Sequence, residues 1–420
     1  MEHRTYLWLH LTFDIIEQSP SEYGRVSDVE ALLSSLPSQV SEAYERILER
    51  SKNEFYTETL LQIVLAAARP LTLDEANAAL ALGVKKGRFE SLAYLESSMW
   101  PRENFKNTVK NLCGLFVSTH ESKLSFVHQT AREFLTHPEM KGKWQGRLSV
   151  SGSQIRMLKM CLDYMSYPDE RMRVSDIRAK FPFAQYSARY WIDHAKSLET
   201  EKDAQESILG FFLHREKAYS VWGRVYDPNF LFPERMRYKY PMASPIYYAS
   251  LVGLRRTVEL LLNEGRDVNS RGGHFGSPFL AACSGGHTEI VQLLLTRGAD
   301  VNAQGGEYGN ALLAACAECH KDTVELLLER DVDINAPNGG YYGNALQAAC
   351  GGGNKDAVQL LLERGADINA QGGRCGTALQ AACHEVYIEV VKLLLAKGAD
   401  VNAQGGEYGN SLQAAAVNGT

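Results

Sequence analysis

The chain has 420 residues, of which 45% are hydrophobic, and a formal net charge of -6. This length suggests two or three domains, and the composition is that of a globular protein rather than a disordered or collagen-like one. Basic and acidic side chains number 12 and 19 from Pro241 onward, against 32 and 31 before it. Because phosphate backbones require a basic surface, the acidic second part argues against general nucleic-acid binding there.

The N-terminal sequence MEHRTYLWLHLTFDII is apolar, but His10 and Asp14 interrupt it and no small-residue cleavage site follows. We therefore expect neither a signal peptide nor, since no run of 18 apolar residues occurs, a membrane-spanning helix. Eight cysteines are too few for a disulfide scaffold. They favour a reducing environment, and we expect a cytoplasmic location, with the nucleus left open.

Helical patterns and turn signals alternate from Met1 to about Leu135. Two amphipathic helices separated at Pro37 are predicted first, and then a helix that ends at Arg69-Pro70. The next helix follows Thr72, which forms a capping box with Glu75. The block continues with a third helix over 102–112 and two strands, LFVST and KLSFVH, joined by a polar turn at 120–122. It ends with a helix over 129–135. Three helices with a two-stranded wing predict a winged-helix arrangement.

From Pro241 onward the sequence repeats. The first helices of six units begin in steps of 33, 33, 34, 33 and 33 residues, at Ser244, Ser277, Asn310, Asn344, Thr377 and Asn410. Each unit predicts a short helix with a Ser, Thr or Asn N-cap, a glycine turn, and a second helix with one apolar face. A glycine-rich connector follows, and the same eleven residues, DVNAQGGEYGN, form it at 300–310 and at 400–410.

These units resemble ankyrin repeats, which have a period of 33 residues with a β-turn and two helices. The resemblance covers about Pro241 to Thr420, although N-A-L-Q or T-A-L-Q replaces the usual T-P-L-H. It implies an α-solenoid of five complete units and a sixth without its second helix, in which units bury their apolar faces against their neighbours. We expect that a longer version of the chain carries more repeats. Ankyrin repeats imply a protein partner.

Five segments resemble the region that follows the nucleotide-binding core in fungal NACHT-type signal-transduction NTPases. They are RTYLWLHLTFDII, SLPSQVSEAYERILERS, AARPLTLDEANAALAL, GLFVSTHESKLSFVHQTAREFL and FPFAQYSARYWIDHA. The resemblance spans about Arg4 to Ala195. It implies a mainly α-helical chain in which a nucleotide-held switch responds to a partner. The expected regions are a helical segment (1–55), a winged-helix-like domain (56–137), a helical linker (138–240) and ankyrin repeats (241–420).

The chain departs from that family in having no G-x-x-x-x-G-K-[ST]. KGKW at 141–144 lacks the hydroxyl and the glycine loop that cradle phosphates. We therefore expect a non-enzymatic interaction module without a cofactor. The alternative is part of a switch NTPase whose core lies in a longer version. By resemblance His128 is a candidate nucleotide sensor, and its other interpretation is a histidine that binds the local backbone at a helix start.

Two further site types are disfavoured. Arg102, Lys106 and Lys110 share one face of the third helix, where DNA-reading winged helices carry recognition residues. The near-neutral charge of the first 240 residues argues against DNA there. Cys316-x-x-Cys319-His320 lacks the second ligand pair that zinc needs, so no metal is expected. Cys316 instead falls in a repeat position shared with Cys283, Cys350 and Cys383.

The tips of the connectors carry the candidate partner-binding residues. One column is aromatic except for Cys375, and its neighbours vary in charge and size. Exposed tyrosines often anchor interfaces, and solenoids vary at such tips. The column rings either contact a partner or stack between adjacent connectors, and the variable neighbours favour contact. The candidates are His274, Phe275, Glu307, Tyr308, Tyr341, Tyr342, Arg374, Glu407 and Tyr408.

Overall fold

The computed structural model describes residues 25, 40–85, 91–140, 142–228, 242–330, 332–337 and 341–417. The N-terminal apolar stretch, the helix predicted before Pro37 and part of the longer connector at 338–340 lie outside them. The described chain is mainly α-helical, which confirms the predicted fold class. It forms two compact units, residues 1–198 with 217–225 and residues 199–216 with 226–420. The expected linker region, 138–240, is therefore divided between the two.

The first unit opens with the winged-helix elements, and their positions follow the sequence expectations closely. Thr72 and Glu75 form the predicted capping box, with the Thr72 backbone N–H 2.8 Å from the Glu75 carboxylate. The helices of this part are α3 (Val40–Glu49), α4 (Glu54–Ala66), α5 (Leu73–Val84), α6 (Leu92–Ser98), α7 (Arg102–Cys113) and α8 (Gln129–Leu135).

The predicted two-stranded wing is instead a three-stranded sheet. Strands β2 (Val117–His120) and β3 (Lys123–Phe126) form the expected hairpin, and β1 (Leu71–Thr72) pairs antiparallel with the other side of β3. A strand of two residues leaves no alternating pattern that could be detected in the sequence. The hairpin turn places Glu121 and Ser122 at φ angles of 47° and 60°, as two-residue hairpin loops require.

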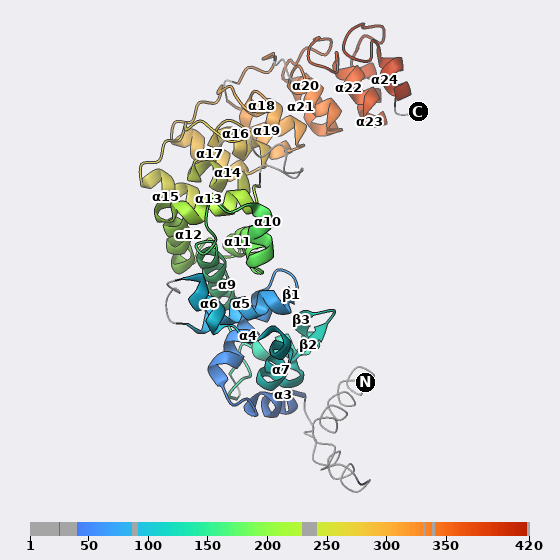
Figure 1. Cartoon of the computed structure of the whole chain (residues 1–420). Helices are drawn as coiled ribbons and strands as arrows, with labels where there is room; N and C mark the ends of the chain where they lie inside the picture. The colour runs from blue at the N-terminus through green and yellow to red at the C-terminus, as the bar shows by residue number, and fades with distance from the viewer. Residues whose placement is uncertain are drawn as a thin grey trace. The chain divides into compact units, whose positions relative to one another are not determined.

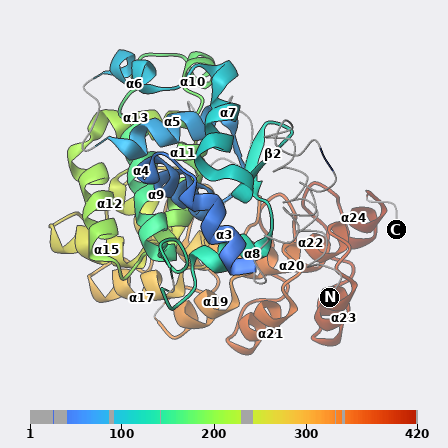
Figure 2. The same ribbon diagram turned by 90° about the horizontal axis from the view of Figure 1, so that it is seen from below.

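Aromatic side chains hold α3 on the winged-helix elements. Tyr44 is buried between Phe116 and Phe134, with ring centroids 4.7 and 5.5 Å away. Figure 2 shows α3 beside α8, which it contacts. The remaining helices of this unit are α9 (Val150–Tyr164), α10 (Val174–Lys180), α11 (Ala184–Lys196) and α13 (Glu216–Val225).

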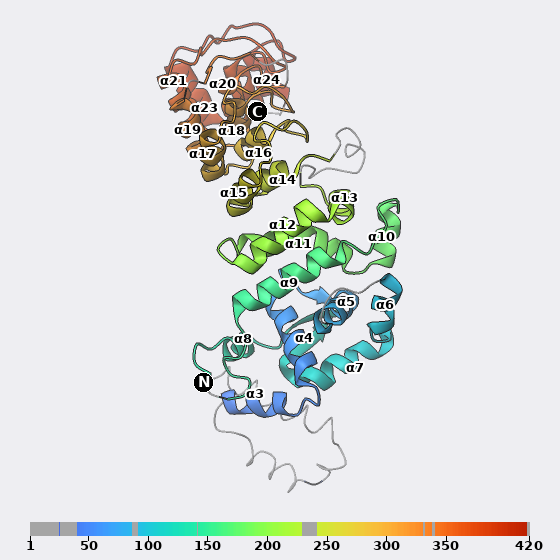
Figure 3. The ribbon, with the colours of Figure 1, turned by 90° about the vertical axis from the view of Figure 1, so that its left-hand side faces the viewer.

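The second unit consists of paired helices, with inner and outer helices in separate rows (Figures 1 and 3). The inner helices are α14 (Pro245–Val252), α16 (Pro278–Ser284), α18 (Ala311–Ala317), α20 (Ala345–Gly351), α22 (Ala378–His384) and α24 (Ser411–Val417). The outer helices are α15 (Arg255–Asn263), α17 (Thr288–Thr296), α19 (Lys321–Leu328), α21 (Lys355–Glu363) and α23 (Ile388–Ala396). The predicted side-chain N-caps occur in five units, and Ser244 in the first unit makes no such bond.

Helix α12 (Lys202–His214) extends the outer row at its N-terminal end, since it packs against α15. The Thr257 hydroxyl of α15 donates to the buried Gln205 side chain of α12 at 2.9 Å. A solenoid requires a helix or repeat that covers the apolar face of its first unit. Helix α12 therefore caps the repeat array.

Candidate partner-binding surface

The connectors between repeats form a row of projecting loops, and an Asp-x-Asn sequence begins each of them. The Asp300 carboxylate accepts from the Asn302 backbone N–H at 3.0 Å and closes a local turn. The asparagine side chain reaches the following unit: Asn269 accepts from the Asp300 N–H at 3.1 Å and donates to the Gly298 carbonyl at 3.0 Å. Asn335 makes both equivalent bonds with the next unit, and Asn369 accepts from the Asp400 N–H at 2.8 Å. The repeated sequence thus links these three connectors to the units that follow them.

The paired glycines allow adjacent connectors to approach at backbone distance. Gly306 has φ 67°, and a Cβ atom there would lie 2.2 Å from the Phe275 carbonyl carbon. No side chain fits at that distance. The tips then pair through their backbones: Glu307 donates to His274 at 3.1 Å, and Arg374 and Glu407 donate at 2.9 Å to Tyr341 and Arg374.

Three of the predicted residues form one exposed group, which we call the tip cluster: Tyr341, Arg374 and Glu407. The Arg374 guanidinium lies 5.7 Å from the Tyr341 ring centroid and forms two hydrogen bonds with the Glu407 carboxylate. These bonds hold the pKa of Glu407 below its usual range. Glu307, one connector earlier, is also exposed.

The predicted aromatic column is half-buried and stacks within the protein. Phe275 and Tyr308 lie parallel, with ring centroids 5.9 Å apart, and Tyr408 stacks on His384 at 4.4 Å. Tyr341 and Tyr342 meet edge to face at 4.8 Å. Stacking between adjacent connectors thus describes the Phe275–Tyr308 pair, whereas Tyr408 packs on a residue at a helix end. The exposed surface at the tips belongs mainly to the charged and tyrosine neighbours of the column.

Helix-end residues beneath the column did not figure among the sequence candidates. The Tyr308 hydroxyl donates to Glu318, which follows α18, and burial is the main cause that raises the pKa of Tyr308. Tyr342 contacts the side of α20 at Gly351, where a Cβ atom would lie 2.4 Å from its ring. Burial raises the pKa of Tyr342 to about 12. Glu318 holds the repeat position of Gly285 and Gly352, and His384 holds the preceding position, that of Ser284 and Gly351. Variation at these two positions is the sequence signal for the two residues.

The sequence analysis also missed two buried glutamines, each of which bonds its inner helix to the following connector. Gln380 donates to the carbonyl groups of Ala403, Gly405 and Gly409 in the following connector at 3.2–3.3 Å. Gln347 donates to Ala370 and Gly376 in the equivalent place. These are the glutamines of the N-A-L-Q and T-A-L-Q sequences, so the departure from T-P-L-H supplies the bonds that position the tips.

His128 is the N-cap of α8, where its Nδ1 accepts from the Thr130 backbone N–H at 3.2 Å. The Thr130 hydroxyl also lies 2.8 Å from the Tyr44 hydroxyl of α3. The structure thus shows the local backbone contact at the helix start. Arg102, Lys106 and Lys110 are exposed along α7, and Arg102 pairs with Asp74 at 2.6 Å.

The Cys316–His320 segment brings no ligand set together. Cys316 is fully buried, the Cys319 thiol donates to the Gly352 carbonyl at 3.1 Å, and His320 bonds to the Ser284 carbonyl at 2.8 Å. Cys319 has φ 62° because it takes the place of a turn glycine. Among the described residues, no three His, Cys, Asp or Glu side chains are grouped to hold a metal ion.

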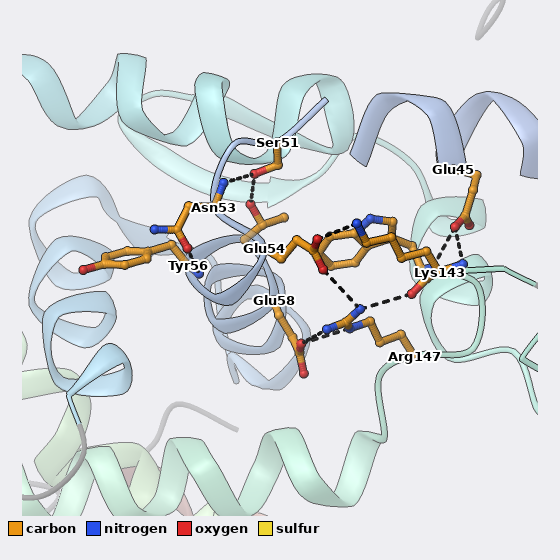
Figure 4. A network of polar contacts seen from close by, with 10 residues as sticks. Glu45, Ser51, Asn53, Glu54, Tyr56, Glu58, Lys143 and Arg147 are labelled. Carbon is orange, nitrogen blue, oxygen red and sulfur yellow. Dashed lines mark hydrogen bonds and ion pairs between the residues drawn. The ribbon is translucent and has the colours of Figure 1, made fainter. Parts of the chain in front are cut away.

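The loop that contains Gly142, Lys143 and Trp144, part of the KGKW sequence, binds a carboxylate of the chain itself (Figure 4). The Glu45 side chain accepts from the backbone N–H groups of Lys143, Trp144 and Gln145, the last two at 2.8 and 3.2 Å. Three successive amides that converge on one anion form a nest. Lys143 also pairs with Glu54 at 2.5 Å, and the loop is thereby tied to α3 and α4.

Comparison with known proteins identifies the same two parts of the chain. Residues 246–338 and 338–405 match ankyrin repeats, and residues 44–145 match the winged helix domain of GPI inositol-deacylase. The azaphilone pigments biosynthesis cluster protein L of Monascus ruber is 31% identical over 289 residues, 62% of this chain and 59% of that protein. The vegetative incompatibility protein HET-E-1 of Podospora anserina is 24% identical over 224 residues, 46% of this chain and 15% of that protein.

The chain thus contains ankyrin repeats and a winged-helix domain, and it spans about three-fifths of the first relative and a much smaller share of the second. Ankyrin repeats are protein-interaction structures, so the surface of this array is where a protein partner is to be sought. Within the part of the chain that the structure describes, no helix has the length and apolarity needed to cross a membrane.

Proposed function

We propose that this chain is the non-enzymatic interaction and sensor module of a NACHT–ankyrin signalling protein, and that it binds a protein partner through its repeats. The observation that carries the proposal is the tip cluster, in which Tyr341, Arg374 and Glu407 are exposed on connectors held rigid by backbone pairing. Tyrosine and arginine are enriched among residues that dominate interface energies. Ordering before binding lowers the entropic cost of association. The likeness to HET-E-1 supports the signalling context.

We further propose that the chain by itself does not hydrolyse nucleotides and works inside the cell. The sequence has no phosphate-binding loop motif, and the amides of the 143–145 loop bind Glu45. The eight cysteines are unpaired, as in a reducing compartment. Isothermal titration of the purified chain with ATP and ADP tests the first point. Tight binding of either nucleotide would support the alternative, part of a nucleotide-dependent switch.

The partner-binding proposal is tested by affinity capture with the tagged chain and its Arg374→Glu and Tyr341→Ala variants, followed by quantitative mass spectrometry. A specific partner is expected to be recovered by the wild type and reduced at least tenfold by both variants. Arg102→Glu, an exposed change on α7, serves as the matched control and is expected to retain the partner. Equal recovery by all four proteins would contradict binding at the tip cluster.

A further inference from the structure

Carboxylates on the outer and inner helices of the repeat array differ in their partners. Those on the outer helices join successive units through three ion pairs, Arg255–Glu289, Lys321–Asp356 and Lys355–Glu389. Glu318 and Glu385, which follow the inner helices α18 and α22, are exposed. Glu318 accepts from the Tyr308 hydroxyl and Glu385 from His384. Among the described residues no lysine or arginine pairs with either glutamate, so neither carboxylate is matched by a permanent positive charge.

Two tyrosine rings lie against the unit between these carboxylates. In that unit Gly352 holds the repeat position of the two glutamates, so the unit supplies no third carboxylate. The rings of Tyr342, half-buried, and Tyr387, exposed, pack on its turn, 351–353, at distances that no added Cβ atom would permit. Burial, Cys375 and then Glu385 raise the pKa of Tyr342, whose hydroxyl therefore lies near the carboxylate of the next unit. We call this surface the glutamate–tyrosine strip, defined by Glu318, Tyr342, Glu385 and Tyr387.

Each glutamate of the strip precedes a strained residue. Cys319 and Val386 have φ angles of 62° and 63°, where other units have Gly286 and Gly353 at 68° and 72°. A left-handed conformation is unfavourable for a residue with a Cβ atom, and most of all for a β-branched valine. Strained residues of this kind cluster at functional sites. Stability therefore does not explain the sequences of these two turns, and both turns carry a glutamate of the strip.

The tip cluster shows what a tyrosine and a glutamate hold together in this array. There the Arg374 guanidinium lies 5.7 Å from the Tyr341 ring centroid and bonds to the Glu407 carboxylate. A guanidinium is planar, so it stacks on an aromatic ring and binds both oxygens of a carboxylate, whereas a lysine ammonium is a point charge. The strip has the same two kinds of side chain, but among the described residues its carboxylates have no arginine.

The spacing of the strip sets the spacing of the cations that fit it. Glu318 and Glu385 are two units apart, and helices that pack about 8–10 Å apart place them about 16–20 Å from each other. An extended chain rises about 3.3 Å per residue, so two cationic residues about five or six positions apart reach both carboxylates.

We propose that the glutamate–tyrosine strip binds an extended, arginine-rich segment of a protein partner, with one arginine at each glutamate and the tyrosine rings as stacking surfaces between them. This inference rests on the proposed function, because it gives the chemistry of the partner that the same array binds. The charge of the array is complementary to such a segment, since acidic side chains outnumber basic ones by 19 to 12 from Pro241 onward. The strip and the tip cluster share no residue, so variants of the two can be tested separately.

The test uses the full chain and fluorescein-labelled octa-arginine, which spans about 26 Å when extended and so reaches both glutamates. Fluorescence anisotropy is measured at about 0.15 M salt, where exposed charges farther apart than about 8 Å are largely screened. Saturable binding is expected, weakened at least tenfold in the double variant Glu318→Gln/Glu385→Gln. Both glutamates are exposed, so a circular dichroism melt is expected to show this variant folded.

The matched control is the double variant Glu329→Gln/Glu363→Gln. It removes the same two charges from exposed glutamates at one repeat position of the outer helices α19 and α21, and it is expected to bind octa-arginine like the wild type. Octa-lysine carries the same charge as octa-arginine without the planar guanidinium groups, and it is expected to bind the wild type at least threefold more weakly.

Three results would overturn the proposal. The first is the absence of saturable octa-arginine binding by the wild type. The second is equal weakening in the two double variants, since net charge rather than the strip would then attract the peptide. The third is equal affinity for octa-lysine and octa-arginine, which would remove the preference for arginine.

Affinity capture separates failure of this inference from failure of the proposed function. A partner that is lost with Arg374→Glu but retained by Glu318→Gln/Glu385→Gln would uphold the proposed function and overturn the role of the strip. A partner recovered equally by the wild type, Arg374→Glu and Tyr341→Ala would contradict binding at the tip cluster. The peptide measurement at the strip would stand in that case, because octa-arginine binding is compared only between strip variants and their control.

Discussion

Thr377 and Gln380 cap one another at the start of α22: the Gln380 N–H donates to the threonine hydroxyl at 3.2 Å, and the Thr377 N–H donates to the Gln380 side-chain oxygen at 2.8 Å. The Gln380 amide nitrogen then donates to the following connector. One side chain therefore both begins a helix and positions the next loop.

Replacement of Gln380 by leucine is expected to destabilise the repeats by about 2–3 kcal/mol, because the buried groups that Gln380 bonds lose their partners. Urea unfolding followed by circular dichroism measures the change. Gln413→Leu is the matched control, since Gln413 holds the same repeat position but is exposed, and it is expected to be nearly neutral. A similar loss in both variants would contradict the role of burial.

Alanine at Gly306 is expected to cost at least about 2 kcal/mol, because a positive φ is combined with the close approach to Phe275. Gly298→Ala isolates the effect of the positive φ, since Gly298 has φ 87° but no atom lies within 4 Å of its added Cβ. That control is expected to cost only about 1 kcal/mol. Thermal unfolding of the two variants separates the cost of the positive φ from the cost of the close contact with Phe275. Equal losses of stability in both variants would show that the close contact adds no cost.

Stability of the first unit is expected to fall in acid through His194. This side chain is buried between Tyr186 and Gln154, at 3.1 and 2.5 Å, and burial lowers its pKa from 6.5 to about 4. The folded state therefore holds it neutral, and above pH 6.5 its ionisation has no effect on stability. As the pH falls from 6.5 towards 4 the unfolded state binds the proton first, which costs up to about 3 kcal/mol.

Urea unfolding of the wild type and of His194→Gln at pH 7 and pH 5 measures this effect. The wild type is expected to lose more free energy of unfolding between the two pH values than the variant does, since glutamine does not ionise. Parallel losses in both proteins would show that other groups cause the acid sensitivity.

Helix α3 is expected to loosen when Glu45 is replaced by glutamine. An amide oxygen accepts less strongly than a carboxylate from the three N–H groups of the 143–145 loop, a loss of about 1–2 kcal/mol. Hydrogen exchange measured by mass spectrometry is expected to rise in residues 40–49. Glu49→Gln, an exposed change on the same helix, is the control. Unchanged protection of α3 in Glu45→Gln would show that Tyr44 and its aromatic neighbours alone hold the helix.

Local sequence signals predicted the features that depend on nearby residues. The capping box at Thr72, the helix of residues 129–135 and the N-caps of the repeats all rest on side chains within three or four positions. The period of 33 residues predicted the register of the array for the same reason, since each unit repeats the signals of the last.

Features that depend on distant residues were not predicted. The bond between Glu45 and the loop at Lys143 joins residues 98 positions apart, and no local pattern marks it. The attachment of α12 to the repeats rests on the contact of Gln205 with Thr257, 52 positions later. The exposed or stacked state of the tip rings was left open, because it depends on how closely neighbouring connectors approach.

The identity of two connectors also affects how the gene for this chain can change. Residues 300–310 and 400–410 are identical, so recombination between their coding segments would remove one hundred residues and leave no altered junction. Asn269 would still bond to Asp300, and Asn310 would precede Ser411 in place of Ala311. The shortened array would retain its helix stacking and one copy of the connector with its glutamate, but it would lose Tyr341 and Arg374. The exposed side chains of the tips can therefore be exchanged in whole units while the fold of each remaining unit is preserved.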